Sequence, residues 1–288
     1  MLGWNKSKID IIIPFYNQHK LLSRCLKSVE LHNSQDVRIV IVNDGSEPQD
    51  IRIIKNLCGN LDLEIILLSH KVNKGFRESI LTGVAHCDGP YVILLNSDTV
   101  VTDNFTRKLT RIMMKDKSIG AVAPISNHPT DLYQFRKKLY LKRHFEDLDH
   151  HQVGDRFAPL LNRSWTSRIK NRLLSDTCTR VPYLSACCLA LNREVFKKAG
   201  FFYQEYEHGY FEDLDLSCCI RNQGYDLAIN EDCFVFHRGQ GSYKDIARAC
   251  KEKLIWKNYD IFVDRWGHLP EHDDLCKRMQ WAGNECPI

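Results

Sequence analysis

Four short, largely apolar runs in the first third of the chain constrain its fold more than any other feature. They occupy residues 9–13, 37–42, 63–68 and 91–95. Runs of this kind are typical of strands that are buried on both faces of a sheet. Segments with the apolar spacing of helices lie between them, so strand alternates with helix. This alternation predicts an α/β fold built on a Rossmann-like, mainly parallel sheet flanked by helices.

Polar residues appear where these strands stop. They lie at residues 14–17, 43–45 and 96–98. Ligands of open α/β sheets bind outside the carboxyl ends of the parallel strands, so we expect these three segments to converge on one crevice. Asp98 ends an apolar strand there, which places a carboxylate where a hard divalent cation can be held. The arrangement suits a nucleotide with a metal on its phosphates.

The alternating pattern continues after a long interruption. A helix over 105–114 and a strand over 119–123 extend the first unit to about residue 125. Residues 126–180 are polar and weakly periodic, and we expect them to form a variable excursion that covers the crevice. The later elements are predicted to be a strand within 183–191, helices over 193–199 and 214–222, strands over 225–229 and 233–237, and an amphipathic helix within 243–266.

Length and charge limit the classes of function. At 288 residues the chain could form one large α/β domain or two small ones, and we favour one domain with elaborations. The net charge of +4 gives a slightly basic surface that suits anionic substrates or membrane headgroups. No basic stripe with interleaved aromatic residues dominates the sequence, so we expect no nucleic-acid partner.

The cysteines and the apolar segments bear on location. The chain has 12 cysteines but no CxxC pair, and doublets such as Cys187-Cys188 lie in apolar segments, which favours buried, reduced thiols. No run reaches the roughly 18 apolar residues of a membrane-spanning helix, and the N-terminus lacks a signal-peptide core. We therefore expect a cytoplasmic protein whose contact with the membrane, if any, is peripheral at its inner face.

Motifs spread over most of the chain resemble one family of enzymes. They are residues 11–17 (IIIPFYN), 42–46 (VNDGS), 73–76 (NKGF), 94–99 (LLNSDT), 193–196 (REVF), 211–215 (FEDLD) and His237. In this order and spacing they resemble family 2 of the inverting glycosyltransferases, which have the GT-A fold, and in particular its rhamnosyltransferase-like branch of polysaccharide biosynthesis. The sequence departs from the family pattern at Leu81, Ala186 and residues 202–203, and over 126–180.

The resemblance implies an organisation and a set of ligands. Residues 1–288 would form a single GT-A domain, with a nucleotide-sugar-binding half over 1–125, an acceptor-side half over 126–242 and a helical tail over 243–288. The donor would be a UDP- or dTDP-linked sugar, bound with Mn²⁺ or Mg²⁺. The acceptor would be a saccharide or a glycolipid in polysaccharide or glycoconjugate synthesis, and the oligomeric state stays open.

The resemblance also assigns the metal site. Asp98 would bind the cation, Asn96 would lie near the ribose with Ser97 beside it, and His237 would join the metal or the diphosphate. Two plainer interpretations stay open. Asp98 also suits a helix cap before residue 105, and His237 suits a satisfied histidine of the core.

The nucleobase would be held by the first two strand ends. Asp44 lies in a turn with Gly45, where its carboxylate could accept the imide hydrogen of uracil or thymine, although such a turn favours Asp in any case. The other residues implied for this part of the site are Pro14, Tyr16 and Asn17, with Gly75 permitting close backbone approach and Arg77 reaching the base or the diphosphate. A surface arginine is an equally good interpretation of Arg77.

An inverting transfer is a single displacement that needs one base to take the proton of the acceptor hydroxyl. By resemblance this base is Asp213, and Glu212 orients the acceptor. The plainer interpretation of Asp213 is a cap or a favourable acid at a helix N-terminus.

Other nucleotide-binding classes fit poorly. Residues 14–17 are not the glycine-rich loop of a Rossmann dehydrogenase, and the motifs of P-loop NTPases and sugar nucleotidyltransferases are missing. The alternative that stays open is a non-catalytic subunit that binds a nucleotide sugar or a saccharide.

Overall fold

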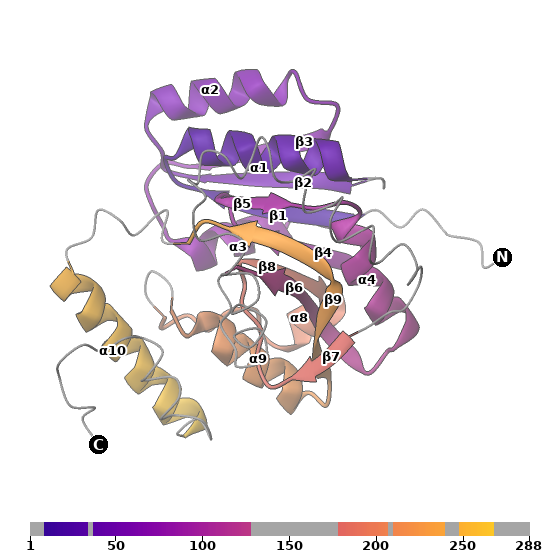
Figure 1. Ribbon diagram of the computed structural model, residues 1–288. Coiled ribbons are helices and arrows are strands. Elements are labelled where there is room, and N and C mark those ends of the chain that lie inside the picture. Colours follow the sequence, from indigo (N-terminus) through magenta and orange to yellow (C-terminus); the bar gives the residue numbers. More distant parts are fainter. Residues whose placement is uncertain (1–8, 34–36, 128–177, 207–209, 240–247, 268–288) are drawn as a thin grey trace.

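One mixed sheet organises the protein (Figure 1). The computed structural model describes residues 9–33, 37–127, 178–206, 210–239 and 248–267. Within these ranges the strands are β1 Ile9–Phe15, β2 Val37–Asp44, β3 Glu64–His70, β4 Tyr91–Leu95, β5 Thr99–Val101, β6 Ile119–Ser126, β7 Cys178–Val181, β8 Cys188–Asn192 and β9 Asp226–His237. The helices are α1 His19–His32, α2 Pro48–Cys58, α3 Phe76–Val84, α4 Phe105–Lys115, α8 Arg193–Lys198, α9 Glu212–Asn222 and α10 Arg248–Trp266. The strand order is β3-β2-β1-β4-β8-β6-β9-β5, and β7 pairs with β9.

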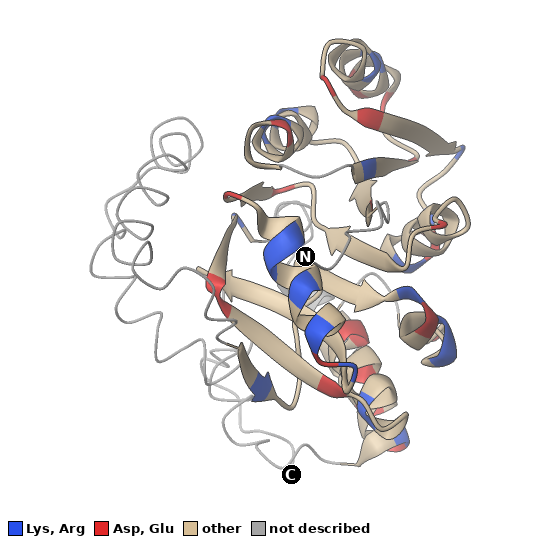
Figure 2. Ribbon diagram, turned by 90° about the vertical axis from the view of Figure 1, so that its right-hand side faces the viewer, with Lys and Arg blue, Asp and Glu red and all other residues tan. Residues whose placement is uncertain are grey.

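The first half of the sheet confirms the predicted alternation. Strands β1, β2, β3 and β4 run parallel, and each apolar run lies in a strand. Side chains such as Leu22 of α1 and Leu109 of α4 pack on one face of the sheet, and Ile80 of α3 and Phe196 of α8 pack on the other. Charged residues lie mostly on the helices and loops, while the strands carry few of them (Figure 2). Burial of both faces explains why β1, β2 and β4 are apolar without alternation. The prediction is wrong for β3, which lies at the edge of the sheet and is only half-buried or exposed.

The second half of the sheet differs from the sequence prediction in two respects. β8 begins at Cys188, so only the end of the predicted run 183–191 is strand, and it lies antiparallel between β4 and β6. The two strands predicted over 225–229 and 233–237 are one strand, β9, with an irregular register after Asn230. The Asn230 side chain donates to the Lys108 carbonyl at 2.7 Å and accepts from the Asp232 nitrogen at 2.8 Å, so its polar groups are satisfied inside a bulge.

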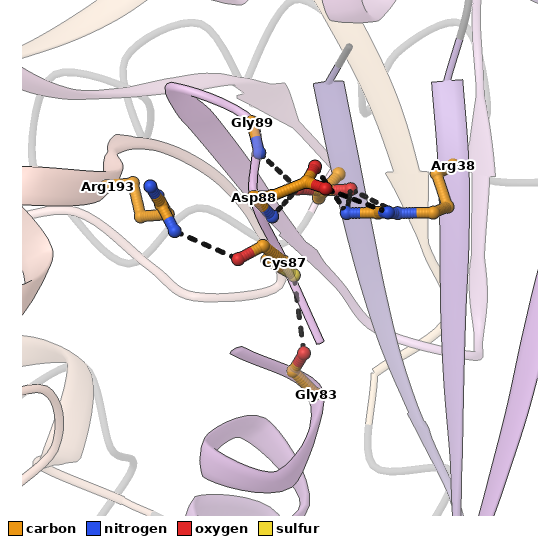
Figure 3. Close-up of polar contacts among 7 residues, drawn as sticks. Arg38, Gly83, Cys87, Asp88, Gly89 and Arg193 are labelled. Carbon is orange, nitrogen blue, oxygen red and sulfur yellow. Dashed lines mark hydrogen bonds and ion pairs between the residues drawn. The ribbon is translucent and has the colours of Figure 1, made fainter. Parts of the chain in front are cut away.

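A cluster of charged residues lies at the amino-terminal ends of the parallel strands, whereas the predicted crevice lies at their carboxyl ends. Figure 3 shows the contacts of this cluster. The Asp10 carboxylate is fully buried and accepts hydrogen bonds from Arg38 at 2.8 Å and from the backbone nitrogens of Asp88 and Gly89. Arg193 donates to the Cys87 carbonyl at 2.9 Å from the other side. A buried carboxylate is tolerated only with such partners, so this cluster joins the loop before β4 to β1 and β2.

The remaining predictions about organisation fall partly outside the described residues. The predicted excursion over 126–180 includes residues 128–177, which lie outside them, and its last residues belong to β7. The predicted tail helix is α10, described from Arg248. Nine cysteines, in the part of the chain before α10, are free thiols. None of the described helices combines the length and the apolar character needed to cross a membrane.

Candidate active site

The end of β2 is tied to the loop before α3 by Asp44. Its carboxylate is 4% exposed and accepts hydrogen bonds from the backbone nitrogens of Lys74 and Gly75, each at 2.8 Å. The Nδ1 atom of His70 lies 2.8 Å from the same carboxylate. Gly45 allows this approach, because a Cβ at its position would lie 2.5 Å from the Val72 carbonyl carbon. Asp44 therefore fixes the loop before α3 against the end of β2, and its contact with a base stays a prediction.

The end of β1 forms a second wall beside it. Asn17 has a left-handed backbone, with φ 52°, and its nitrogen donates to the Ser46 hydroxyl at 2.8 Å. Its side-chain oxygen accepts a hydrogen bond from the Glu47 nitrogen at 3.0 Å. Hydrogen bonds therefore join the segments that follow β1 and β2, which the predicted crevice requires. Pro14, one residue before the end of β1, is half-buried, whereas Tyr16 is 42% exposed and accessible to a ligand.

Gly75 and Arg77 mark the start of α3. Gly75 has φ 89°, and a Cβ there would meet nothing within 4 Å, so the backbone faces open space that a ligand can approach. Arg77 donates from Nε to the Phe202 carbonyl at 2.8 Å and pairs with Glu78. The bond to Phe202 holds α3 to the segment after α8, and the role of Arg77 toward a base or diphosphate stays a prediction.

Asp98 and His237 lie together at the end of β4 and β9. The Oδ1 atom of Asp98 is 3.1 Å from the Nε2 atom of His237, and both side chains are largely buried. The side-chain Nδ2 atom of Asn96 is 3.4 Å from the same Nε2 atom. Ser97 lies half-buried in the turn between Asn96 and Asp98. The pairing of Thr99 with His237 across β5 and β9 fixes this arrangement. The structure thus brings Asn96, Asp98 and His237 together, and their role toward a metal or a diphosphate stays a prediction.

The charge on His237 depends on its neighbours. Burial disfavours the imidazolium, but hydrogen bonds to Asp98 and to Cys187 outweigh it and raise the pKa of His237 to about 10. Asp98 is not a helix cap, since α4 begins at Phe105 and its cap is Asn104. Within the described ranges no third His, Cys, Asp or Glu completes a metal-binding group with them. A carboxylate and an imidazole still fit a cation that takes its other ligands from phosphates and water.

Asp213 and Glu212 form the first turn of α9. The Asp213 carboxylate accepts from the Ala186 nitrogen at 3.4 Å and from the Leu214 nitrogen at 3.0 Å. Asp213 is not the helix cap, because α9 begins at Glu212 and Phe211 precedes it. The acid therefore faces the loop before β8.

Both carboxyl groups are held in an environment that disfavours charge. Burial raises the pKa of Asp213, although its hydrogen bonds to Ala186 and Leu214 act in the opposite direction. Burial, together with the charge of Asp213, raises the pKa of Glu212 to about 8. The buried Oε2 atom of Glu212 has no hydrogen-bond partner within the described part of the chain. Shifted pKa values of this kind are typical of catalytic acids and bases.

Residues 186 and 187 connect Asp213 to the turn that carries Asn96 and Asp98. The Ala186 nitrogen contacts Asp213, and the Cys187 carbonyl accepts from the Asn96 nitrogen at 2.9 Å. The pair of Asp98 and His237 and the carboxylate of Asp213 thus lie on either side of one short segment before β8. Sequence reasoning noted Ala186 as a departure from the family pattern but gave it no role, because its contribution is a backbone N–H that any residue except proline supplies.

Two curated proteins are similar in sequence to part of this chain. The chain is 36% identical over 117 residues to an N-acetylglucosaminyltransferase of a Rhizobium species, covering 39% of this chain and 25% of that protein. It is 26% identical over 130 residues to the teichoic acid poly(glycerol phosphate) polymerase of Staphylococcus epidermidis, covering 45% of this chain and 18% of that protein. The chain thus spans a quarter or less of the length of these relatives.

Solved structures share the fold at low sequence identity. A crystal structure of GalNAc-T7 with UDP, GalNAc and Mn²⁺ aligns with a TM-score of 0.60 and 16% identity, covering 82% of this chain and 44% of that chain. The mannosyltransferase PcManGT from Pyrobaculum calidifontis, in complex with GDP-Man and Mn²⁺, aligns with a TM-score of 0.57 and 15% identity, covering 96% and 81%. The predicted GT-A fold is confirmed. The sequence profile described as Glycosyl transferase family 2 matches residues 10–200, which is more than half of the chain. The protein therefore belongs to glycosyl transferase family 2.

Proposed function

We propose that the protein is an inverting glycosyltransferase that moves a sugar from a nucleoside-diphosphate sugar to a saccharide or glycolipid acceptor. The observation that carries the proposal is the position of Asp213. Its carboxylate, on a half-buried residue, lies across residues 186–187 from the pair of Asp98 and His237. A base and a diphosphate site on either side of one short segment suit attack on the sugar from the face opposite the leaving group.

The chemistry divides between the two groups. In the proposed reaction Asp213 takes the proton of the acceptor hydroxyl as that oxygen bonds to the anomeric carbon. The bond from this carbon to the diphosphate oxygen breaks in the same displacement, so the configuration inverts. A bound Mn²⁺ or Mg²⁺ would neutralise the departing diphosphate, and Asp98 and His237 are the side chains that would hold it. The pKa of Glu212 is raised to about 8, so its carboxyl group is neutral at lower pH. In this form it would donate a hydrogen bond that orients the acceptor.

The donor class is supported by the comparisons. The two similar structures contain UDP and GDP-Man, each with Mn²⁺, and the curated relatives include an N-acetylglucosaminyltransferase and a teichoic acid polymerase. Among nucleoside diphosphates we propose UDP or dTDP, because the acceptor oxygens of Asp44 lie beside the crevice and complement an imide N–H. Polysaccharide or glycoconjugate synthesis is the proposed setting.

The test separates chemistry from binding. Donors are first screened by thermal shift with Mn²⁺, since a true donor stabilises the folded state by mass action. Asp213→Asn should then lower the transfer rate by roughly 10²- to 10⁴-fold and leave donor affinity unchanged. Asp226→Asn, which alters a surface ion pair on β9, is the matched control and should transfer at the parent rate.

Product stereochemistry completes the test. The anomeric configuration of the product, read by NMR, should be opposite to that of the donor. A product that retains configuration, or a fully active Asp213→Asn variant, would exclude the single displacement. Tight donor binding by the parent without any turnover would instead indicate a non-catalytic binding subunit.

A further inference from the structure

The turn that precedes the two active-site acids has an unusual backbone. Tyr210 and Phe211 have φ values of 71° and 69°, so two consecutive residues with side chains adopt the left-handed conformation. Each such residue costs roughly 1 kcal/mol or more and persists only when its surroundings hold it. Glu212 and Asp213 follow directly, so whatever holds this turn also fixes the direction of both carboxyl groups.

The C-terminal helix supplies that support. Asn258 of α10 is completely buried, and its side-chain amide donates to the Tyr210 carbonyl at 3.1 Å. The Phe211 ring packs against the rings of Tyr259 and Phe262 of the same helix, at centroid distances of 5.7 and 5.8 Å. α10 therefore holds the strained turn through a hydrogen bond from Asn258 and through the aromatic contacts of Tyr259 and Phe262.

A second anchor lies on the other side of the two acids. Asp215 is completely buried, and its Oδ1 atom accepts from the Arg265 Nε at 2.7 Å and from the Trp266 indole nitrogen at 2.6 Å. The Arg265 guanidinium also lies over the Tyr203 ring, 3.6 Å from its centroid. α10 thus bonds to Tyr210, which precedes Glu212 and Asp213, and to Asp215, which follows them. The helix runs along the flank of the molecule in Figure 1.

We propose that Asn258 is a positioning residue for the transfer reaction, which rests on the proposed function and deepens it. Asn258 occupies the apolar face of α10, between Ile255 and Phe262, where a leucine would satisfy packing alone. A buried amide costs free energy unless it is hydrogen-bonded, and here the bond is made to the strained turn. Asn258 acts through Tyr210 to hold the base at the distance that proton transfer requires, since small misplacements cost large factors in rate.

The experiment compares two variants that remove the hydrogen-bond donor of residue 258 with a control variant that keeps it. Asn258→Leu keeps the number and branching of the side-chain heavy atoms and Asn258→Asp keeps the shape, and both lose the amide N–H that reaches Tyr210. We expect kcat to fall about tenfold to a hundredfold in each. The Kd for UDP with Mn²⁺, measured by calorimetry, should stay within about twofold of the parent value with the same stoichiometry, because the residues of the donor crevice lie on other elements. The matched control Ile255→Val, in the same helix, should turn over at the parent rate.

Each outcome separates this inference from the proposed function when Asp213→Asn is measured in the same assay. An inactive Asp213→Asn beside a fully active, folded Asn258→Leu would overturn the positioning role and leave the function intact. A fully active Asp213→Asn would overturn the proposed function itself. Failure of both Asn258 variants to fold, or an equal loss of kcat and of UDP-binding stoichiometry, would show that Asn258 serves stability alone.

Discussion

The Oδ2 atom of Asp44 accepts a hydrogen bond from the backbone nitrogen of Gly75 at 2.8 Å, which joins the end of β2 to the N-terminus of α3. The other oxygen accepts from Lys74, so both oxygens face N–H donors. Asp44→Asn places an NH₂ group against one of these donors, and the loop over 73–75 should loosen. We expect the affinity for UDP with Mn²⁺ to fall about tenfold, which corresponds to roughly 1.4 kcal/mol.

Calorimetric titration of UDP into the parent and the variant measures this loss. Asp62→Asn, at an exposed position on another loop, is the control and should bind as the parent does. Parent-like affinity in Asp44→Asn would show that this loop is not part of the donor site. A preference of the parent for GDP over UDP and dTDP would remove the base-recognition role of Asp44.

The contact between Asp98 and His237 predicts metal-dependent binding. UDP should bind more tightly with Mn²⁺ than with EDTA, and Asp98→Asn should abolish this difference because it removes the negative charge from the pair. The imidazole must lose its proton to act as a ligand, and its pKa is raised to about 10, so Mn²⁺ affinity should increase with pH between 6 and about 9. Calorimetry at several pH values, with proton release measured in buffers of different ionisation enthalpy, checks both statements. Equal UDP affinity with and without metal would exclude the site.

The raised pKa of Glu212 predicts a pH-dependent stability. Its folded-state pKa of about 8 exceeds the ordinary value of 4.5, so the folded protein holds this proton more tightly than the unfolded chain does. The resulting stabilisation is complete below pH 4.5 and is lost as the pH rises through about 8. Glu212→Gln cannot ionise and avoids this loss.

Relative to the parent, the free energy of unfolding of Glu212→Gln should therefore increase by at least about 1 kcal/mol between pH 5 and pH 9. Urea unfolding at both pH values measures the difference. Parallel pH profiles of the two proteins would show that Glu212 is not held in a low-dielectric site.

The cluster around Asp10 predicts a change in stability without a change in function. Arg38→Met leaves the fully buried carboxylate of Asp10 without its cation, and the free energy of unfolding should fall by roughly 3 kcal/mol. The cluster closes the edge of the sheet opposite the crevice, so UDP affinity of the folded variant should equal that of the parent. A variant as stable as the parent would show that the backbone nitrogens of Asp88 and Gly89 suffice to hold Asp10.

Much of the first half of the fold follows from the sequence, because doubly covered parallel strands must be apolar. The strands predicted over 9–13, 37–42 and 91–95 all form, and the polar residues after them do meet at one edge. The antiparallel direction of β8 is not predictable in this way, since apolar periodicity is the same for either direction. The division of β9 into two predicted strands reflects the polar residues of its bulge, which only tertiary contacts satisfy.

The site shows the same limit. The roles of Asp98, Asp213 and His237 are predicted from motifs, whereas the contacts of Ala186 and Asn258 depend on elements far away in the chain. The one sequence signal for Asn258 is an amide on the apolar face of an amphipathic helix. A polar residue at such a position needs a partner, but its identity comes from packing alone.

The long segment between β6 and β7 has both of its ends on the same strand. β6 ends at Ser126 opposite Val235, and β7 begins at Cys178 opposite Asn230, so the chain leaves β9 and returns to it only a few residues away. Doubling the length of a flexible connection with fixed ends costs only about 0.6 kcal/mol in closure entropy. Insertions and deletions there can therefore accumulate without disturbing strand pairing, so the length of this connection can change while β6, β7 and β9 keep their register.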